Sequence, residues 1–182
     1  MLLDAQRSTV LVIDVQKKLL PAIADHATVA ANTAWLVRVA QKLGIPVAAT
    51  EQYPRGLGPL DDSIRALLPD AAVATKNHFS CVAAGCLSGL PGTDRAQVVV
   101  AGIEAHVCVL QTVLELIEDG REVYVVADAV GSRRPDDRDL AMARMRQEGA
   151  RIVTREMVAF EWLKEAGTSL FKDVSKEFLR DL

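Results

Sequence analysis

Short runs of branched apolar residues alternate along this chain with stretches of helical spacing, and this alternation constrains the fold most. Six runs have the character of strands buried on both faces, at residues 9–14, 46–50, 71–75, 97–101, 122–127 and 151–153. Helical spacing predicts helices over residues 28–43, 60–68, 107–119 and 136–148, with a turn-rich loop at residues 53–59. Glycine follows three of these helices, at Gly44, Gly120 and Gly149.

Strands that alternate with helices of this length form βαβ units with right-handed crossovers. We therefore predict a three-layer α/β/α, Rossmann-like domain with a mostly parallel six-stranded sheet in the order 3-2-1-4-5-6. The chain has 182 residues, half of them hydrophobic, which suits one compact domain over residues 1–182. In such sheets ligands bind at the carboxyl ends of the strands, so the residues that end strands are the first functional candidates.

Composition excludes several classes of function. The formal net charge is −3 without a basic cluster, which argues against a nucleic-acid surface. No apolar run is long enough to span a bilayer, and the first one resembles a strand rather than a signal peptide, so we expect a cytoplasmic protein without a membrane partner. The three cysteines, an odd number, predict neither a disulfide framework nor a structural zinc site.

Three residues at strand ends carry candidate chemistry. Cys108 falls in the first turn of the helix after the fourth strand, where backbone amides and the helix dipole favour a thiolate. Asp14 ends the first strand, where a carboxylate facing a cleft can carry a proton. Lys76 ends the third strand and could lower the pKa of Cys108. The lysine would have to reach inward over about 10 Å, the width of two strand spacings.

Each of these residues also has an ordinary structural interpretation. Cys108 could be a packed thiol between two valines, because small buried cysteines are common in cores. Asp14 could cap the turn after its strand, and Lys76 could be a solvated surface residue. The combination of all three is what favours a catalytic site.

The combination resembles the isochorismatase-like cysteine hydrolases over nearly the whole chain. The motifs are Asp14-Val-Gln16 after the first strand, the lysine that closes the third, and Gly102-Ile-Glu-Ala-His-Val-Cys-Val opening a helix. Residues 50–58, Thr-Glu-Gln-Tyr-Pro-Arg-Gly-Leu-Gly, are similar to the short isochorismatase domain-containing proteins. The segment Gly-x-x-x-x-x-Cys-Val is the most specific of these motifs.

The resemblance implies a role for each matching position. Cys108 would be the nucleophile, Asp14 the general base and acid, and Lys76 the third catalytic member. Members usually have a cis peptide shortly before the cysteine, here Ile103–Glu104, which would turn the Glu104 amide toward the Cys108 amide as an oxyanion hole. The expected reaction is cleavage of a C–N bond in a small amide-type substrate through a thioester on Cys108.

The surroundings of the site extend these expectations. Side chains expected to contact the small-molecule substrate are Gln16, Glu51, Gln52, Tyr53, His78 and Phe79, although residues 51–53 could equally be a solvated loop. Nicotinamidases of the family bind a metal through an Asp-x-His after the second strand, and this stretch has no histidine. We therefore expect no metal and no cofactor. The family often forms dimers or larger assemblies, so a homo-oligomer is expected.

Two alternatives belong to other functional classes. A haloacid-dehalogenase-type phosphatase also ends its first strand with an aspartate, but it needs Asp-x-Asp, and the third residue here is Gln16. A non-catalytic oligomeric binding protein could keep the same site residues without turnover. In that case Trp162 and Phe171 could cover a partner subunit, although packing into the chain's own core is the simpler interpretation.

Overall fold

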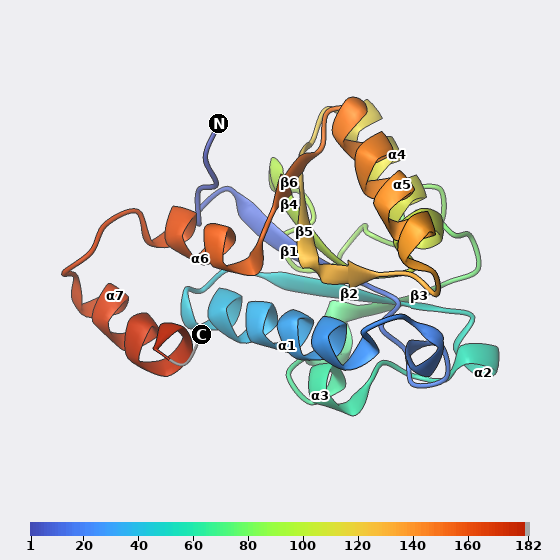
Figure 1. Ribbon diagram of the computed structural model, residues 1–182, viewed down its shortest axis with the longest axis horizontal. Helices are drawn as coiled ribbons and strands as arrows, with labels where there is room; N and C mark the ends of the chain where they lie inside the picture. The colour runs from blue at the N-terminus through green and yellow to red at the C-terminus, as the bar shows by residue number, and fades with distance from the viewer. Residues whose placement is uncertain (181–182) are drawn as a thin grey trace.

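The computed structural model describes residues 1–180 and has three layers, with helices on both sides of one sheet (Figure 1). All six strands pair in parallel, in the order β3-β2-β1-β4-β5-β6. Their bounds are β1 Ser8–Ile13, β2 Val47–Gln52, β3 Val73–Lys76, β4 Gln97–Ile103, β5 Glu122–Gly131 and β6 Arg151–Val153. The predicted fold class and strand order are confirmed.

The helices divide between the two faces of the sheet (Figure 1). Their bounds are α1 His26–Lys42, α2 Pro54–Leu57, α3 Asp62–Arg65, α4 Leu110–Glu118, α5 Pro135–Gln147, α6 Arg155–Leu163 and α7 Ser169–Val174. Buried residues of α1, α3 and α6 form one apolar cluster with the sheet, and those of α4 and α5 form another on the opposite face. None of the helices within residues 1–180 is long and apolar enough to cross a membrane.

The central strand β1 shows why the sheet must be covered on both faces. All six of its residues are buried, and their side chains alternate between the two clusters: Val10 and Val12 lie in one, Leu11 and Ile13 in the other. Each fully buried aliphatic side chain of this size stabilises the fold by about 1.5–3 kcal/mol. A strand with this composition has no face that could be turned to water, so it lies in the middle of the sheet.

Element bounds differ from the sequence predictions where local turns intervene. The helix predicted over residues 60–68 is reduced to the four residues of α3, whose N-terminus is capped by the Asp61 side chain. The predicted loop at residues 53–59 contains the short helix α2. Strand β5 runs four residues beyond the predicted end at residue 127, because a register shift opposite Val100 and Gly102 lets the pairing with β4 resume.

Trp162 and Phe171, the two aromatic residues that could have covered a partner subunit, differ in their burial. Trp162 is buried in the chain's own core, and its indole N–H donates to the Ser8 hydroxyl at 3.0 Å. It therefore closes the sheet at the start of β1 and is not free to cover another chain. Phe171 is half-buried at the start of α7.

Candidate active site

The carboxyl ends of β1 and β3 meet through an ion pair across the intervening strand. The Lys76 ammonium donates to one oxygen of the Asp14 carboxylate at 2.7 Å, and both side chains are fully buried. Strand β2 lies between their strands, so the lysine side chain spans the gap that the sequence had predicted. A buried ion pair with this geometry is held by further hydrogen bonds on both partners.

Asp14 sits just past β1 in the left-handed backbone region, with φ of 53°. This region is uncommon for residues other than glycine and is tolerated best by short polar side chains such as aspartate. The carboxylate oxygen that does not bind Lys76 accepts a hydrogen bond from the Thr50 hydroxyl at 2.8 Å. Both oxygens are thus fixed, which sets the direction in which the carboxylate faces.

Glycine is required at position 102 because β4 passes very close to β1 beside this carboxylate. The backbone φ of Gly102 is 133°, and a Cβ atom there would lie 2.1 Å from the carbonyl oxygen of Ile13. The glycine that begins this motif therefore has a local physical cause, since any side chain would push the two strands apart.

Lys76 has acceptors for all three of its ammonium protons. Besides Asp14, the amide oxygen of Gln52 lies 2.6 Å from Nζ, and the carbonyl oxygens of Phe79 and His78 lie at 2.9 and 3.3 Å. Burial is the largest single influence and lowers the pKa of this ammonium, but the charge and hydrogen bond of Asp14, together with the nearby Cys108 and Cys81, leave the pKa above its ordinary value. Lys76 is therefore a fixed positive charge rather than a proton donor.

Cys108 lies in a π-helical turn, Ala105–Val109, that leads into α4, and the residue is 5% exposed. Burial and, after it, the Asp14 charge raise the pKa of its thiol, Lys76 opposes them, and the net pKa is about 12. The prediction of an easily ionised thiol is wrong for this reason, since desolvation and the neighbouring carboxylate outweigh the helix terminus. The resting sulfur is protonated and faces a carboxylate that can accept the proton.

The peptide bond between Ile103 and Glu104 is cis, as the resemblance implied. The Glu104 amide N–H donates to no protein acceptor within residues 1–180. Its carboxylate is engaged elsewhere, because one oxygen accepts from the Arg133 backbone N–H at 3.1 Å and from the Arg133 side chain at 3.0 Å. The backbone amide is therefore available to a ligand while the side chain is held away.

Three predicted substrate contacts, Gln16, Glu51 and Gln52, belong instead to the supporting framework. The amide of Gln16 is fully buried and exchanges hydrogen bonds with the backbone of Gln52, with Gly58 as a further acceptor. A Glu51 carboxylate oxygen accepts from the Leu60 amide at 2.8 Å. These side chains satisfy backbone groups that the buried strand ends leave without partners, which costs less than leaving them unpaired.

The other predicted contacts lie at the rim. Tyr53 and Phe79 are 54% and 52% exposed. Tyr53 and His78 line a pocket of about 530 Å³ that also reaches Lys76. The pocket therefore lies at the end of β3, and its size suits a small molecule.

Thr50 is the functional residue that sequence reasoning named only as a strand end. Its signal was the register of β1 against β2, in which Ile13 pairs with Thr50 and the Asp14 amide donates to the Thr50 carbonyl at 3.1 Å. This pairing places the Thr50 side chain of β2 against the Asp14 carboxylate.

The residues that end β2 do not fit the metal site of nicotinamidases. Thr50 is bound to Asp14, Glu51 to Leu60, and Gln52 to Lys76. Within residues 1–180, no group of three or more His, Cys, Asp and Glu side chains could hold a metal ion.

Comparison with known proteins places these features in a family. The family model described as "Isochorismatase domain" matches residues 8–157. Isochorismatase domain-containing protein 2 of Danio rerio is 38% identical over 177 residues, which cover 96% of this chain and 88% of that protein.

Two solved structures are similar over nearly the whole chain. One is the MAR1 ribonuclease of Caenorhabditis elegans, 33% identical with a TM-score of 0.87, covering 97% of this chain and 91% of that one. The other is the Escherichia coli YcaC gene product, described as an octameric hydrolase of unknown specificity. It is 26% identical with a TM-score of 0.90, covering 100% of this chain and 92% of that one.

Proposed function

The chain belongs to the isochorismatase family of hydrolases, and from this we propose that it is a cysteine hydrolase that cleaves a C–N bond in a small amide-type substrate. The observation that carries the proposal is the meeting of three groups from distant parts of the chain. The buried Asp14–Lys76 ion pair lies close enough to Cys108 for both charges to act on the pKa of its thiol.

In the first half of the proposed reaction, Asp14 takes the proton from Cys108 as the sulfur attacks the carbonyl carbon of the amide. Lys76 keeps its charge throughout and offsets the negative charge that remains near Asp14. The oxyanion forms where the Glu104 and Cys108 amides can donate to it, and one such donor contributes about 3 kcal/mol in comparable enzymes.

Asp14 then returns the proton to the leaving amine, and the C–N bond breaks to give a thioester on Cys108 and a free amine. In the second half, Asp14 removes a proton from water, which attacks the thioester. The products are the carboxylic acid and the regenerated thiol, which takes back the proton. Every proton moves between groups of this chain, the substrate and water, so the proposed reaction uses no cofactor.

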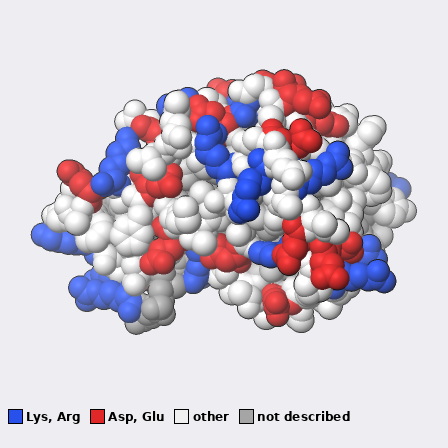
Figure 2. Space-filling model, turned by 45° about the horizontal axis from the view of Figure 1, so that its top comes forward, with Lys and Arg blue, Asp and Glu red and all other residues white. Residues whose placement is uncertain are grey.

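The test below also distinguishes two alternatives, RNA cleavage and binding without catalysis. The relative from C. elegans is named a ribonuclease, and a catalytically silent site would fit a binding protein. Positive and negative side chains are interspersed over the face drawn in Figure 2, without the continuous basic surface that RNA binding favours. This observation supports the small-molecule substrate, as does the pocket beside Lys76.

The test is a panel of small amides assayed for amine release, with RNA cleavage measured in parallel. We expect amine release by the wild type, and loss of it in Cys108→Ala and Cys108→Ser. Cys86→Ala is the matched control, because this thiol lies outside the proposed site and should leave turnover unchanged. Amide cleavage that survives in Cys108→Ala, or RNA cleavage that depends on Cys108 without any amide turnover, would overturn the proposal.

A further inference from the structure

Two thiols that the proposed mechanism does not use lie side by side between β3 and β4. Cys81 is buried and Cys86 is half-buried, and both are free. The amide of Cys86 donates to the Cys81 carbonyl at 3.3 Å, and the Cys86 thiol donates to the same oxygen at 3.4 Å. Gly85, with φ of 62°, reverses the chain between them. The two side chains are close enough for a hydrogen bond between them.

The surroundings give the two thiols different chemistry. A hydrogen bond from Cys81 holds the pKa of the Cys86 thiol below its usual range, although burial opposes this. The same interaction, together with burial, raises the pKa of Cys81 well above its usual value. Cys86 is therefore the sulfur that ionises more readily and also the one that reagents reach, and the partially exposed thiolate is the form that peroxides oxidise.

We propose that Cys81 and Cys86 form an oxidisable dithiol, which a peroxide closes into an intramolecular disulfide while Cys108 stays reduced. The Cys86 sulfur attacks a peroxide oxygen and becomes a sulfenic acid, and with hydrogen peroxide the first product is water. The Cys81 sulfur then attacks the sulfenic sulfur, the S–S bond forms, and a second water leaves. Two thiols are oxidised and one peroxide is reduced to water.

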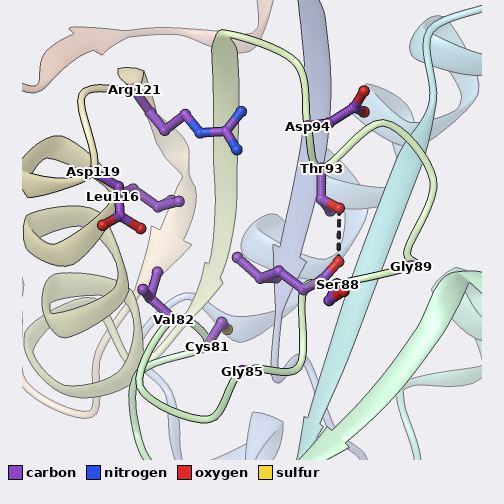
Figure 3. Close-up of a pocket in the computed structure, with 11 residues that line it drawn as sticks. Cys81, Val82, Gly85, Ser88, Gly89, Thr93, Asp94, Leu116, Asp119 and Arg121 are labelled. Carbon is purple, nitrogen blue, oxygen red and sulfur yellow. Dashed lines mark hydrogen bonds between the residues drawn. The ribbon is translucent and has the colours of Figure 1, made fainter.

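The position of the pair connects it with the active site. The Cys81 thiol donates to the Thr50 hydroxyl at 3.7 Å, and this hydroxyl donates to Asp14. Disulfide formation removes that S–H. Oxidation therefore removes the first donor of the hydrogen-bond chain that runs from Cys81 through Thr50 to Asp14. Cys81 also lines a cavity of about 350 Å³, in which it lies at the end opposite Asp94 and Arg121 (Figure 3). The disulfide itself does not depend on the proposed function.

The experiment treats the reduced full chain with hydrogen peroxide, alkylates the remaining thiols, and maps them by mass spectrometry. Before alkylation we expect an intact mass lower by two hydrogens. After alkylation we expect a Cys81–Cys86 linked peptide and one added alkyl group, on Cys108. Oxidation of Cys108 while Cys81 and Cys86 remain alkylatable would overturn the proposal, as would three reduced thiols after a treatment that oxidises a control dithiol peptide.

Two variants make the result specific. Cys86→Ser should abolish the linked peptide and leave Cys81 reduced, because the buried sulfur is not the one that peroxide reaches. Cys108→Ala should form the linked peptide at the wild-type rate. A disulfide that forms in Cys86→Ser between Cys81 and Cys108 would contradict the assignment. Since all of these readouts are masses, they remain informative if no amide substrate is found.

Discussion

At the scale of single residues, Asp14 has two opposing effects on Cys108. Its negative charge raises the pKa of the thiol, together with burial, while the same carboxylate is the base that the proposed reaction needs. The site therefore holds a protonated thiol and deprotonates it only as the sulfur attacks. Sequence reasoning anticipated the partners but not the resting protonation state, because desolvation depends on what surrounds the sulfur in space.

Replacing Asp14 with Asn separates these two effects. One cause of the raised Cys108 pKa disappears while Lys76 remains, so the thiolate fraction at a given pH increases. In a pH series of iodoacetamide labelling, we expect the inflection for Cys108 to fall below the wild-type value of about 12. Amide turnover should nevertheless drop by about 10²–10⁴-fold, because the general base is lost. An unchanged inflection would show that the carboxylate does not act on this sulfur.

Gln52 and Asp14 both position the Lys76 ammonium. Its amide oxygen accepts from Nζ at 2.6 Å and its amide nitrogen donates to the Asn77 carbonyl at 2.8 Å. We expect Gln52→Leu to remove one hydrogen bond from the buried ammonium and to leave the Asn77 carbonyl without this donor, at a cost of about 1–3 kcal/mol. The free energy of unfolding measured in urea should fall accordingly.

The conservative variant Gln52→Glu tests whether the acceptor is what matters. It keeps an oxygen near Nζ, so it should recover a large part of the stability and the turnover that Gln52→Leu loses. Equal losses in both variants would indicate that the shape of the glutamine side chain, rather than its hydrogen bond to Lys76, supports the site.

At the scale of elements, the strand ends determine where the chemistry lies. The sequence predicted all six strands and their order, because buried parallel strands have continuous apolar runs with little ambiguity. The strand ends pointed to the three candidate residues, and the resemblance to the family implied the cis peptide. It assigned Gln16, Glu51 and Gln52 to the substrate, because their hydrogen-bond partners lie far away in the sequence. No pattern along the chain predicts which loop folds back onto which strand.

The contact between β1 and β4 gives a prediction at this scale. Gly102→Ala should destabilise the fold by more than about 2 kcal/mol, because a positive φ and a clash with the Ile13 backbone act together. Gly44→Ala is the matched control, since Gly44 also has a positive φ but no atom within 4 Å of the added carbon. Its cost should be about 1 kcal/mol. Similar urea midpoints for the two variants would contradict the close approach.

At the scale of the whole molecule, apolar side chains remain exposed on the outer helices. Met157 and Phe160, one turn apart on α6, are 47% and 46% exposed, and Leu140 on α5 is 71% exposed. Exposed apolar side chains on a helix surface often mark an interface between chains.

We therefore predict that the chain is a homo-oligomer in solution. Size-exclusion chromatography with light scattering should give a mass at least twice that of one chain. Phe160→Glu should reduce that mass if α6 lies in the interface, because a charge would be buried there. A monomer at micromolar concentration would contradict the prediction, and Leu140→Glu is the companion variant on the other face of the sheet.

The most direct test of the account is the capture of the thioester. Wild-type protein mixed with a cleaved amide, or with an activated ester of the same acyl group, should be quenched in acid and measured by intact mass and peptide mapping. We predict one acyl group on Cys108, removed by hydroxylamine and absent in Cys108→Ala. Turnover without any acylated Cys108, or acylation confined to Cys81 or Cys86, would contradict the central claim.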